Sequence, residues 1–279
     1  MKLPKITTRQ QDILELLYTY RYLDRVQIQA FMNHKDKRRV LSWLKDLRDK
    51  NYVEWIYSTD FAEKTKPAIY YISINGVRYL KTVQADDDSA YYPIEEVRKR
   101  YKDNQRSRTF IDRCLLVANC CLSLKAVNDL ENTANGNKIT YDYLTESDYI
   151  SPDHEYHFLA EHEVLRPNLC IIRQRGQTTK NYLLEIFDAT LPRYRIRRRL
   201  KGYVGYLDDN EWEGDEPEPI VLLACATLTD LIYAKRATKK LIADTYADDI
   251  HIRFTTSERL KLDGVNADIW EEGRERSGL

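Results

Sequence analysis

The C-terminal half of the chain alternates short β-type runs with longer helical patterns, and this alternation most narrows the possible folds. The run IVLLACA at 220–226 is apolar throughout, as expected for a strand covered on both faces. The predicted elements of this half are strands at 138–143, 165–173, 182–188, 220–226 and 249–255, with helices at 192–207 and 228–243. This order predicts an α/β domain built on a mixed sheet.

Residues 1–81 follow a different pattern, three short amphipathic helices and then two strands. The first helix is predicted to begin at an N-cap Thr8 and the second at an N-cap Asp24. The first helix repeats apolar residues at a spacing of three and four, namely Ile13, Leu16, Leu17 and Tyr20. The second is predicted to bury Ile28, Phe31 and Met32.

The third helix, predicted at 36–50, has two faces of opposite character. Its apolar stripe is formed by Val40, Leu44 and Leu47, and Asn51 follows at the position where a left-handed residue often ends a helix. The other face is hydrophilic and strongly basic, with Lys37, Arg38, Arg39, Ser42 and Lys45.

Two strand patterns, 52–57 and 68–74, follow this helix and are joined by a polar loop containing Lys64 and Lys66. Asn75-Gly76 is expected to form the turn that leaves the second strand. Three helices followed by a two-stranded ribbon match the plan of a winged helix-turn-helix domain. Residues 82–130 are expected to hold a linker, at 82–90, and connecting helices. The α/β domain is expected to occupy 131–279, after a turn at 131–137.

Charge is distributed unevenly although the whole chain is neutral. Residues 1–81 contain 16 Lys and Arg against 9 Asp and Glu, while the remainder contains 28 against 35. A basic N-terminal module favours an anionic partner. A basic helix on a helix-turn-helix scaffold fits the major groove of double-stranded DNA, and Lys64 and Lys66 would hold phosphates beside it. The alternative is a solvated basic face that contacts proteins.

A second basic cluster opens the helix predicted at 192–207, with Arg193, Arg195, Arg197, Arg198, Arg199 and Lys201. These charges repel one another unless anions or carboxylates neutralise them. The cluster is therefore interpreted either as a track for the phosphate backbone or as part of a salt network within the chain or a dimer. The acidic loop 208–219 is the neutralising segment nearest in sequence.

Other functional classes find little support. Histidines at 154, 157 and 162 alternate with glutamates, but their spacing matches no known metal motif, and a surface segment is the simpler interpretation. The chain has no GxSxG, GxxxxGK[ST] or GxGxxG motif. Five cysteines without a CxxC pair indicate a reducing compartment, so a cytoplasmic location is expected. No signal peptide or membrane span is predicted, and no cofactor or metal is expected.

Several stretches, in the same order, resemble the replication-relaxation family of bacterial plasmids and mobile elements. The N-terminal stretches are TTRQQDILELLYTYRYLDRVQIQAF, RRVLSWLKDLRDKNYV and AIYYISINGVRYL. The C-terminal stretches are LRPNLCIIR, YLLEIFDATLPRYRIRRRLKGYVGYL and HIRFTTSERL.

The resemblance implies a C-terminal domain akin to the restriction-endonuclease-like, or PD-(D/E)XK, fold. Nuclease chemistry there needs an acid on one strand and Glu-x-Lys on the next, so that two carboxylates hold a metal. In this chain Asn168 falls at the acidic position and Glu185 matches the carboxylate, while Phe187 replaces the lysine. Glu163, five residues before Asn168, is the acidic residue that could take the place of the missing carboxylate. This pattern implies a vestigial site without hydrolysis.

The sequence as a whole predicts a double-stranded DNA-binding protein that controls replication, transfer or transcription of a plasmid, integrative element or phage. A homodimer is expected because duplex readers often bind paired half-sites. One alternative is a metal-dependent nickase or nuclease that uses Glu163, Glu185 and Asp188. Another is an adaptor that binds replication or conjugation proteins.

Overall fold

The computed structural model divides the chain into two compact units, Met1–Ala118 and Asn119–Leu279. The structure describes residues 3–57, 65–86, 100–131, 138–162, 165, 167–209, 212–214, 217–245 and 250–273. Residues 132–137 of the predicted turn and most of the predicted wing loop therefore lie outside the described residues, while Glu131 is the last residue of a helix.

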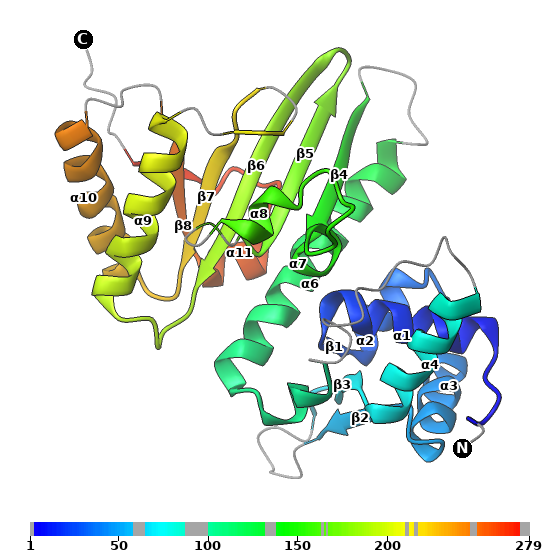
Figure 1. Cartoon of the computed structure of the whole chain (residues 1–279). Helices are drawn as coiled ribbons and strands as arrows, with labels where there is room; N and C mark the ends of the chain where they lie inside the picture. Colours follow the sequence, from blue (N-terminus) through cyan, green and yellow to red (C-terminus); the bar gives the residue numbers. More distant parts are fainter. Residues whose placement is uncertain are drawn as a thin grey trace. The chain divides into compact units, whose positions relative to one another are not determined.

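The first unit contains the predicted helices and ribbon, followed by further helical segments (Figure 1). Its elements are α1 (Thr8–Tyr20), β1 (Leu23–Asp24), α2 (Arg25–Phe31), α3 (Lys37–Asp49), β2 (Val53–Ile56), β3 (Ile69–Ile72), α4 (Ile74–Asp86), the 3-10 helix η1 (Arg100–Gln105) and the start of α6 (Arg108–Glu131). The strands form an antiparallel sheet in the order β1-β3-β2.

Capping boxes fix where the first two helices begin. Thr7, not the predicted Thr8, caps α1: its hydroxyl oxygen accepts a hydrogen bond from the Gln10 amide, and the Gln10 side chain accepts one from the Thr7 amide. Asp24 caps α2 as predicted, and Gln27 completes the same motif. Asn51 has a φ of 57°, as its position after α3 predicts.

Asn75-Gly76 does not form the predicted turn but lies in the first turn of α4. A Cβ atom on Gly76 would come within 2.5 Å of both the Tyr52 carbonyl oxygen and a side-chain carbon of Ile72. The glycine is therefore used for close packing of α4 on the strands. Because α4 continues to Asp86, the predicted linker at 82–90 begins as helix.

Residues 100–118 are integrated into the first unit. The connecting helices predicted within 82–130 include η1 and α6, with an interruption between them, and 87–99 lie outside the described residues. Asp103 is buried, and its carboxylate accepts hydrogen bonds from the Arg21 guanidinium. The Tyr22 phenol donates to the Asp103 carbonyl oxygen, and Ile111 joins an apolar cluster with Tyr22 and Tyr71. The boundary between the units thus falls inside α6, not at residue 81.

The second unit is a mixed α/β domain. Its elements are the end of α6, β4 (Ile139–Thr145), α7 (Glu146–Tyr149), α8 (Phe158–Glu161), β5 (Leu169–Arg175), β6 (Thr178–Phe187), α9 (Arg193–Asp208), β7 (Ile220–Cys225), α10 (Leu228–Thr245), β8 (Ile252–Thr256), α11 (Ser257–Asp263) and β9 (Glu271–Glu272). All strands join one six-stranded sheet in chain order. The β6–β7 and β7–β8 pairs are parallel and the others are antiparallel.

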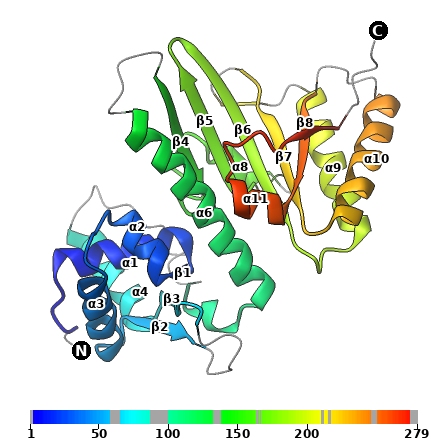
Figure 2. The ribbon, with the colours of Figure 1, turned by 180° about the vertical axis from the view of Figure 1, so that it is seen from behind.

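Helices cover both faces of this sheet, as the apolar run at 220–226 predicts. The helices α9 and α10 lie on one face, and Figure 2 shows the end of α6 together with α11 on the other. Leu200 and Tyr203 of α9 pack on Leu183 and Phe187 of β6 in the main apolar core. No helix in the described ranges is long and apolar enough to cross a membrane.

Candidate nucleic-acid interface

The predicted basic face of α3 lies at the surface. Val40, Leu44 and Leu47 have no solvent exposure, so they fix which side of the helix faces the core. The opposite side exposes every residue predicted for DNA binding on this helix, namely Lys37, Arg38, Arg39, Ser42 and Lys45. The helix begins at this basic end because the Asp36 carboxylate accepts hydrogen bonds from the backbone amides of Arg38 and Arg39.

Most of these cations have no neutralising partner among the described residues. In the part of the chain that the structure describes, Lys37, Arg38 and Lys45 form no ion pair. The Arg39 guanidinium lies 5.9 Å from the centre of the Trp43 ring. Exposed cations on one rigid helix, without carboxylates to pair them, form a surface suited to an anionic ligand.

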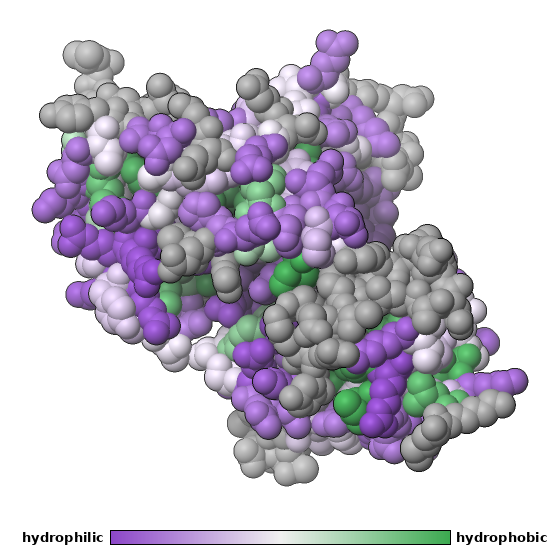
Figure 3. Space-filling view, in the orientation of Figure 1, coloured by the Kyte–Doolittle hydropathy of each residue, from purple (hydrophilic) through white to green (hydrophobic). Residues whose placement is uncertain are grey.

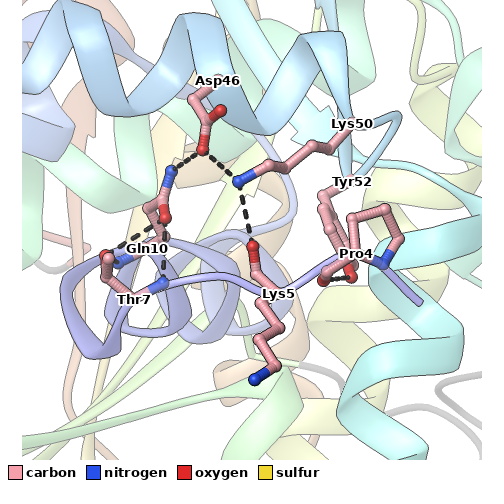
Figure 4. A network of polar contacts seen from close by, with 7 residues as sticks. All are labelled: Pro4, Lys5, Thr7, Gln10, Asp46, Lys50 and Tyr52. Atoms are coloured by element: carbon pink, nitrogen blue, oxygen red, sulfur yellow. Dashed lines mark hydrogen bonds and ion pairs between the residues drawn. The ribbon is translucent and has the colours of Figure 1, made fainter. Parts of the chain in front are cut away.

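A polar network on the inner side of α3 fixes this helix against α1 and the N-terminal segment (Figure 4). The Asp46 carboxylate accepts hydrogen bonds from Gln10 Nε2 at 2.6 Å and from Lys50 Nζ at 2.7 Å. Lys50 also donates to the Lys5 carbonyl oxygen at 2.9 Å. These donors, Lys50 first, lower the pKa of the Asp46 carboxyl below its ordinary value. The network holds α3 in one orientation, which a duplex reader needs.

The ribbon next to α3 carries an aromatic stack that the sequence analysis missed. Trp55 and Tyr57 are 43% and 47% exposed, and their rings are stacked with centroids 5.5 Å apart. The Arg48 guanidinium lies 4.4 Å from the centre of the Trp55 ring. The signal was present in the sequence, because residues 55 and 57 share one face of a strand. The Lys66 side chain beside this ribbon is exposed, whereas Lys64 lies outside the described residues.

The second basic cluster is divided by the fold. On α9, Arg193, Arg195, Arg197, Arg198 and Lys201 are exposed, and the side of the unit formed by α9 and α10 is largely hydrophilic in Figure 3. Arg195, Arg197 and Lys201 form no ion pair with any described residue, including those of the acidic loop 208–219. Arg199 turns inward instead, and its Nε donates to Glu185 Oε1 at 2.7 Å.

Glu185 and Asn168, the two vestigial candidates in the described residues, both have structural partners. Glu185 is buried on β6 beside the Arg199 guanidinium and the Tyr203 phenol. Burial, followed by the charge of Glu185, raises the pKa of Tyr203 well above its ordinary value. Asn168 Oδ1 accepts a hydrogen bond from the Ile186 amide at 2.7 Å, which extends the pairing of β5 with β6.

The other two positions of the nuclease pattern, Phe187 and Glu163, supply no metal ligand among the described residues. The Phe187 ring is buried in the core, and Glu163 lies outside the described residues. The histidines of the same region have separate local contacts. His157 Nε2 lies 3.7 Å from Glu161 Oε1, while His154 Nδ1 and His162 Nδ1 each accept a backbone amide hydrogen bond. The described residues contain no cluster of His, Cys, Asp or Glu that could hold a metal ion.

The β5–β6 hairpin carries further cations that the sequence analysis did not select. Arg173 and Lys180 lie directly opposite each other, and Arg175 shares their face at the tip. None of the three forms an ion pair among the residues described here. Like charges at directly opposite positions destabilise a strand pair, so this face of the hairpin carries unrelieved repulsion.

Replacing Lys180 with Glu is expected to stabilise the protein, because the new carboxylate would face Arg173. The free energy of unfolding should rise by about 0.2–1 kcal/mol in urea titrations. Lys239→Glu, the same change of charge at an exposed position of α10, serves as the control and should give no such gain. Equal effects of the two substitutions would show that the cross-strand repulsion is absent.

Comparisons with known proteins add little to this geometry. No protein-family model matches the chain, and no curated protein matches it. Among solved structures, the restriction endonuclease FokI is similar over 91% of this chain and 43% of its own, with 14% sequence identity and a TM-score of 0.29. The chain thus spans less than half of that structure. A TM-score below 0.5 does not establish a shared fold, so nothing about this protein's fold or function follows from it.

Proposed function

We propose that this protein binds double-stranded DNA through a winged helix in its first unit, with α3 as the recognition helix. The exposed basic face of α3, on which Lys37, Arg38 and Lys45 form no ion pair with any described residue, carries this proposal. An α-helix fits the major groove, where Arg and Lys reach guanine edges. The three helices and the antiparallel ribbon supply the rigid scaffold that such a reader requires.

The second unit adds contacts to the phosphate backbone in this proposal. Its exposed cations on α9 are Arg193, Arg195, Arg197, Arg198 and Lys201. Arg199 is left out because its charge is used by Glu185. Backbone contacts of this kind position a protein on DNA without reading the sequence.

We further propose that the second unit is an endonuclease-like domain that does not cleave DNA. The six-stranded mixed sheet is compatible with that class. Glu185 is paired with an arginine, and the Asn168 oxygen is used by a backbone amide, so neither is set up as a metal ligand. Incubation of supercoiled DNA with Mg²⁺ or Mn²⁺ is expected to leave it uncut. Nicking by the wild-type protein that is lost in the Glu185→Gln variant would contradict the proposal that the domain does not cleave DNA.

The biological role in this proposal is control of replication, transfer or transcription of a mobile element by a cytoplasmic homodimer. The role rests on the resemblance to the replication-relaxation family. The homodimer rests on the fact that proteins which read double-stranded DNA often bind paired half-sites. Light scattering is expected to give twice the mass of one chain.

The test of DNA binding is a salt titration of the full-length protein with the duplex found upstream of its own gene. The logarithm of the affinity should fall linearly with the logarithm of the salt concentration, because bound cations release counterions from the phosphates. Specific binding should persist at moderate salt, where binding to an unrelated duplex is lost. Equal affinity for both duplexes would contradict recognition by α3.

A further inference from the structure

Arg48, Trp55 and Tyr57 form a stack at the surface of the first unit. The Trp55 and Tyr57 rings are parallel to within 14°, and the Tyr70 ring lies 6.3 Å from Trp55 on the neighbouring strand. Two large aromatic residues are therefore held with parallel rings and are almost half exposed, although exposure of apolar surface to water is unfavourable. We propose that this stack binds unpaired nucleobases, so that the ligand is single-stranded DNA beside the duplex site.

The flatness of the stack favours a base that has left the double helix. In a duplex the faces of the bases are covered by their neighbours and only their edges can be read from the grooves. An exposed aromatic face is complementary to a base face, and such faces are available only on unpaired or unstacked nucleotides. The rings of Trp55 and Tyr57 are already aligned, so little side-chain entropy is lost when a base is added.

The charge around the stack favours a nucleic acid over a protein partner. Arg38, Leu41, Lys45 and Arg48 recur at helical spacing along α3, so the stack continues the stripe that ends at Arg48. Arg38 and Lys45 form no ion pair with the described residues. Of the two nearby carboxylates, Asp49 lies 3.5 Å from the Arg48 guanidinium, and Glu54 accepts a hydrogen bond from the Tyr71 phenol and keeps its charge. The cations that favour a nucleic acid are therefore those further along the stripe, Lys45 and Arg38.

The inference rests on the proposed function and makes it more specific. A protein that reads a duplex with α3 and holds unpaired bases on the adjoining ribbon would prefer DNA that is locally open beside its site. A duplex with a single-stranded overhang should therefore bind more tightly than the blunt duplex of the same sequence.

Tryptophan fluorescence of the full-length protein gives a direct test, with a short dT oligonucleotide as the probe. The chain has four tryptophans, and stacking of a base on Trp55 should quench its emission. Trp55→Phe should keep the affinity for dT, measured by anisotropy of a labelled oligonucleotide, and lose the quenching. Trp270→Phe, which removes a tryptophan from the second unit, should keep both.

Trp55→Ala should weaken binding of dT by about tenfold, within the range known for stacking of one base, and blunt duplex binding by less than twofold. Tyr57→Leu, beyond the end of β2, provides a second variant that keeps apolar bulk without a flat ring, and it should also weaken dT binding. Circular dichroism confirms that each variant is folded.

Three results would overturn the inference: no binding of dT by the wild type, wild-type affinity in both Trp55→Ala and Tyr57→Leu, or quenching that survives in Trp55→Phe. The proposed function fails separately, if the blunt duplex is not bound specifically. Specific duplex binding without dT binding would therefore remove only the stacking site, and would point to a protein partner for the exposed rings.

Discussion

Replacing Arg199 with Met is expected to lower the free energy of unfolding by about 3 kcal/mol. The substitution leaves the Glu185 carboxylate buried without its cation, and breaking a buried pair by removing one partner is strongly destabilising. We expect the lower end of the usual range, because 20% of the Arg199 side chain remains exposed against 8% for Glu185. Urea denaturation measures the change.

The same helix offers the control for this prediction. Arg197→Met removes an exposed arginine two residues away and should change stability by about 0.5 kcal/mol or less. The double variant Glu185→Leu, Arg199→Met should recover most of the loss, because a well-packed apolar pair can replace a buried ion pair. If Arg199→Met and Arg197→Met lose the same amount, Arg199 is not an internal partner of Glu185 but part of the exposed basic surface.

Removal of the two arginines at the start of α3 should have the largest effect on DNA binding. The double variant Arg38→Ala, Arg39→Ala is expected to lose about 2–4 kcal/mol of binding free energy for the specific duplex, or roughly 30- to 1000-fold in affinity, if both side chains reach base edges. The helix should remain intact, because Asp36 caps it through backbone amides that the substitutions keep. Fluorescence anisotropy at fixed salt measures the affinity.

A matched variant separates this effect from a simple loss of charge. Arg9→Ala, Arg78→Ala removes two exposed arginines from α1 and α4 of the same unit. It should weaken binding to the specific and the unrelated duplex alike, and by less than tenfold. A loss of the same size in both double variants would mean that α3 contributes charge but does not read sequence.

Errors in the sequence analysis arose where a residue's role depends on distant neighbours. Gly76 follows an asparagine and is typical of a turn, but its missing side chain is needed where α4 meets the Tyr52 carbonyl. The helical segment at 100–118 was assigned to connecting helices, because the sequence does not reveal that Asp103 and Arg21, 82 residues apart, form an ion pair. The cap of α1 was ambiguous locally, because Thr7 and Thr8 each have a glutamine three residues later, at positions 10 and 11, and either pair fits a capping box.

Local periodicity was enough to predict the helices α1, α2, α3, α9 and α10 and the longer strands, but not α4 or the short elements. It also predicted the outward basic face of α3, because residues three and four apart share a face and apolar burial decides which face points inward. Three contacts depend on how the elements pack: Arg199 points inward to Glu185, Asn168 extends the pairing of β5 with β6, and Arg48 lies over Trp55. Each of these contacts joins different elements of the chain. No local pattern records such a contact, since it forms only when packing of the core brings the elements together.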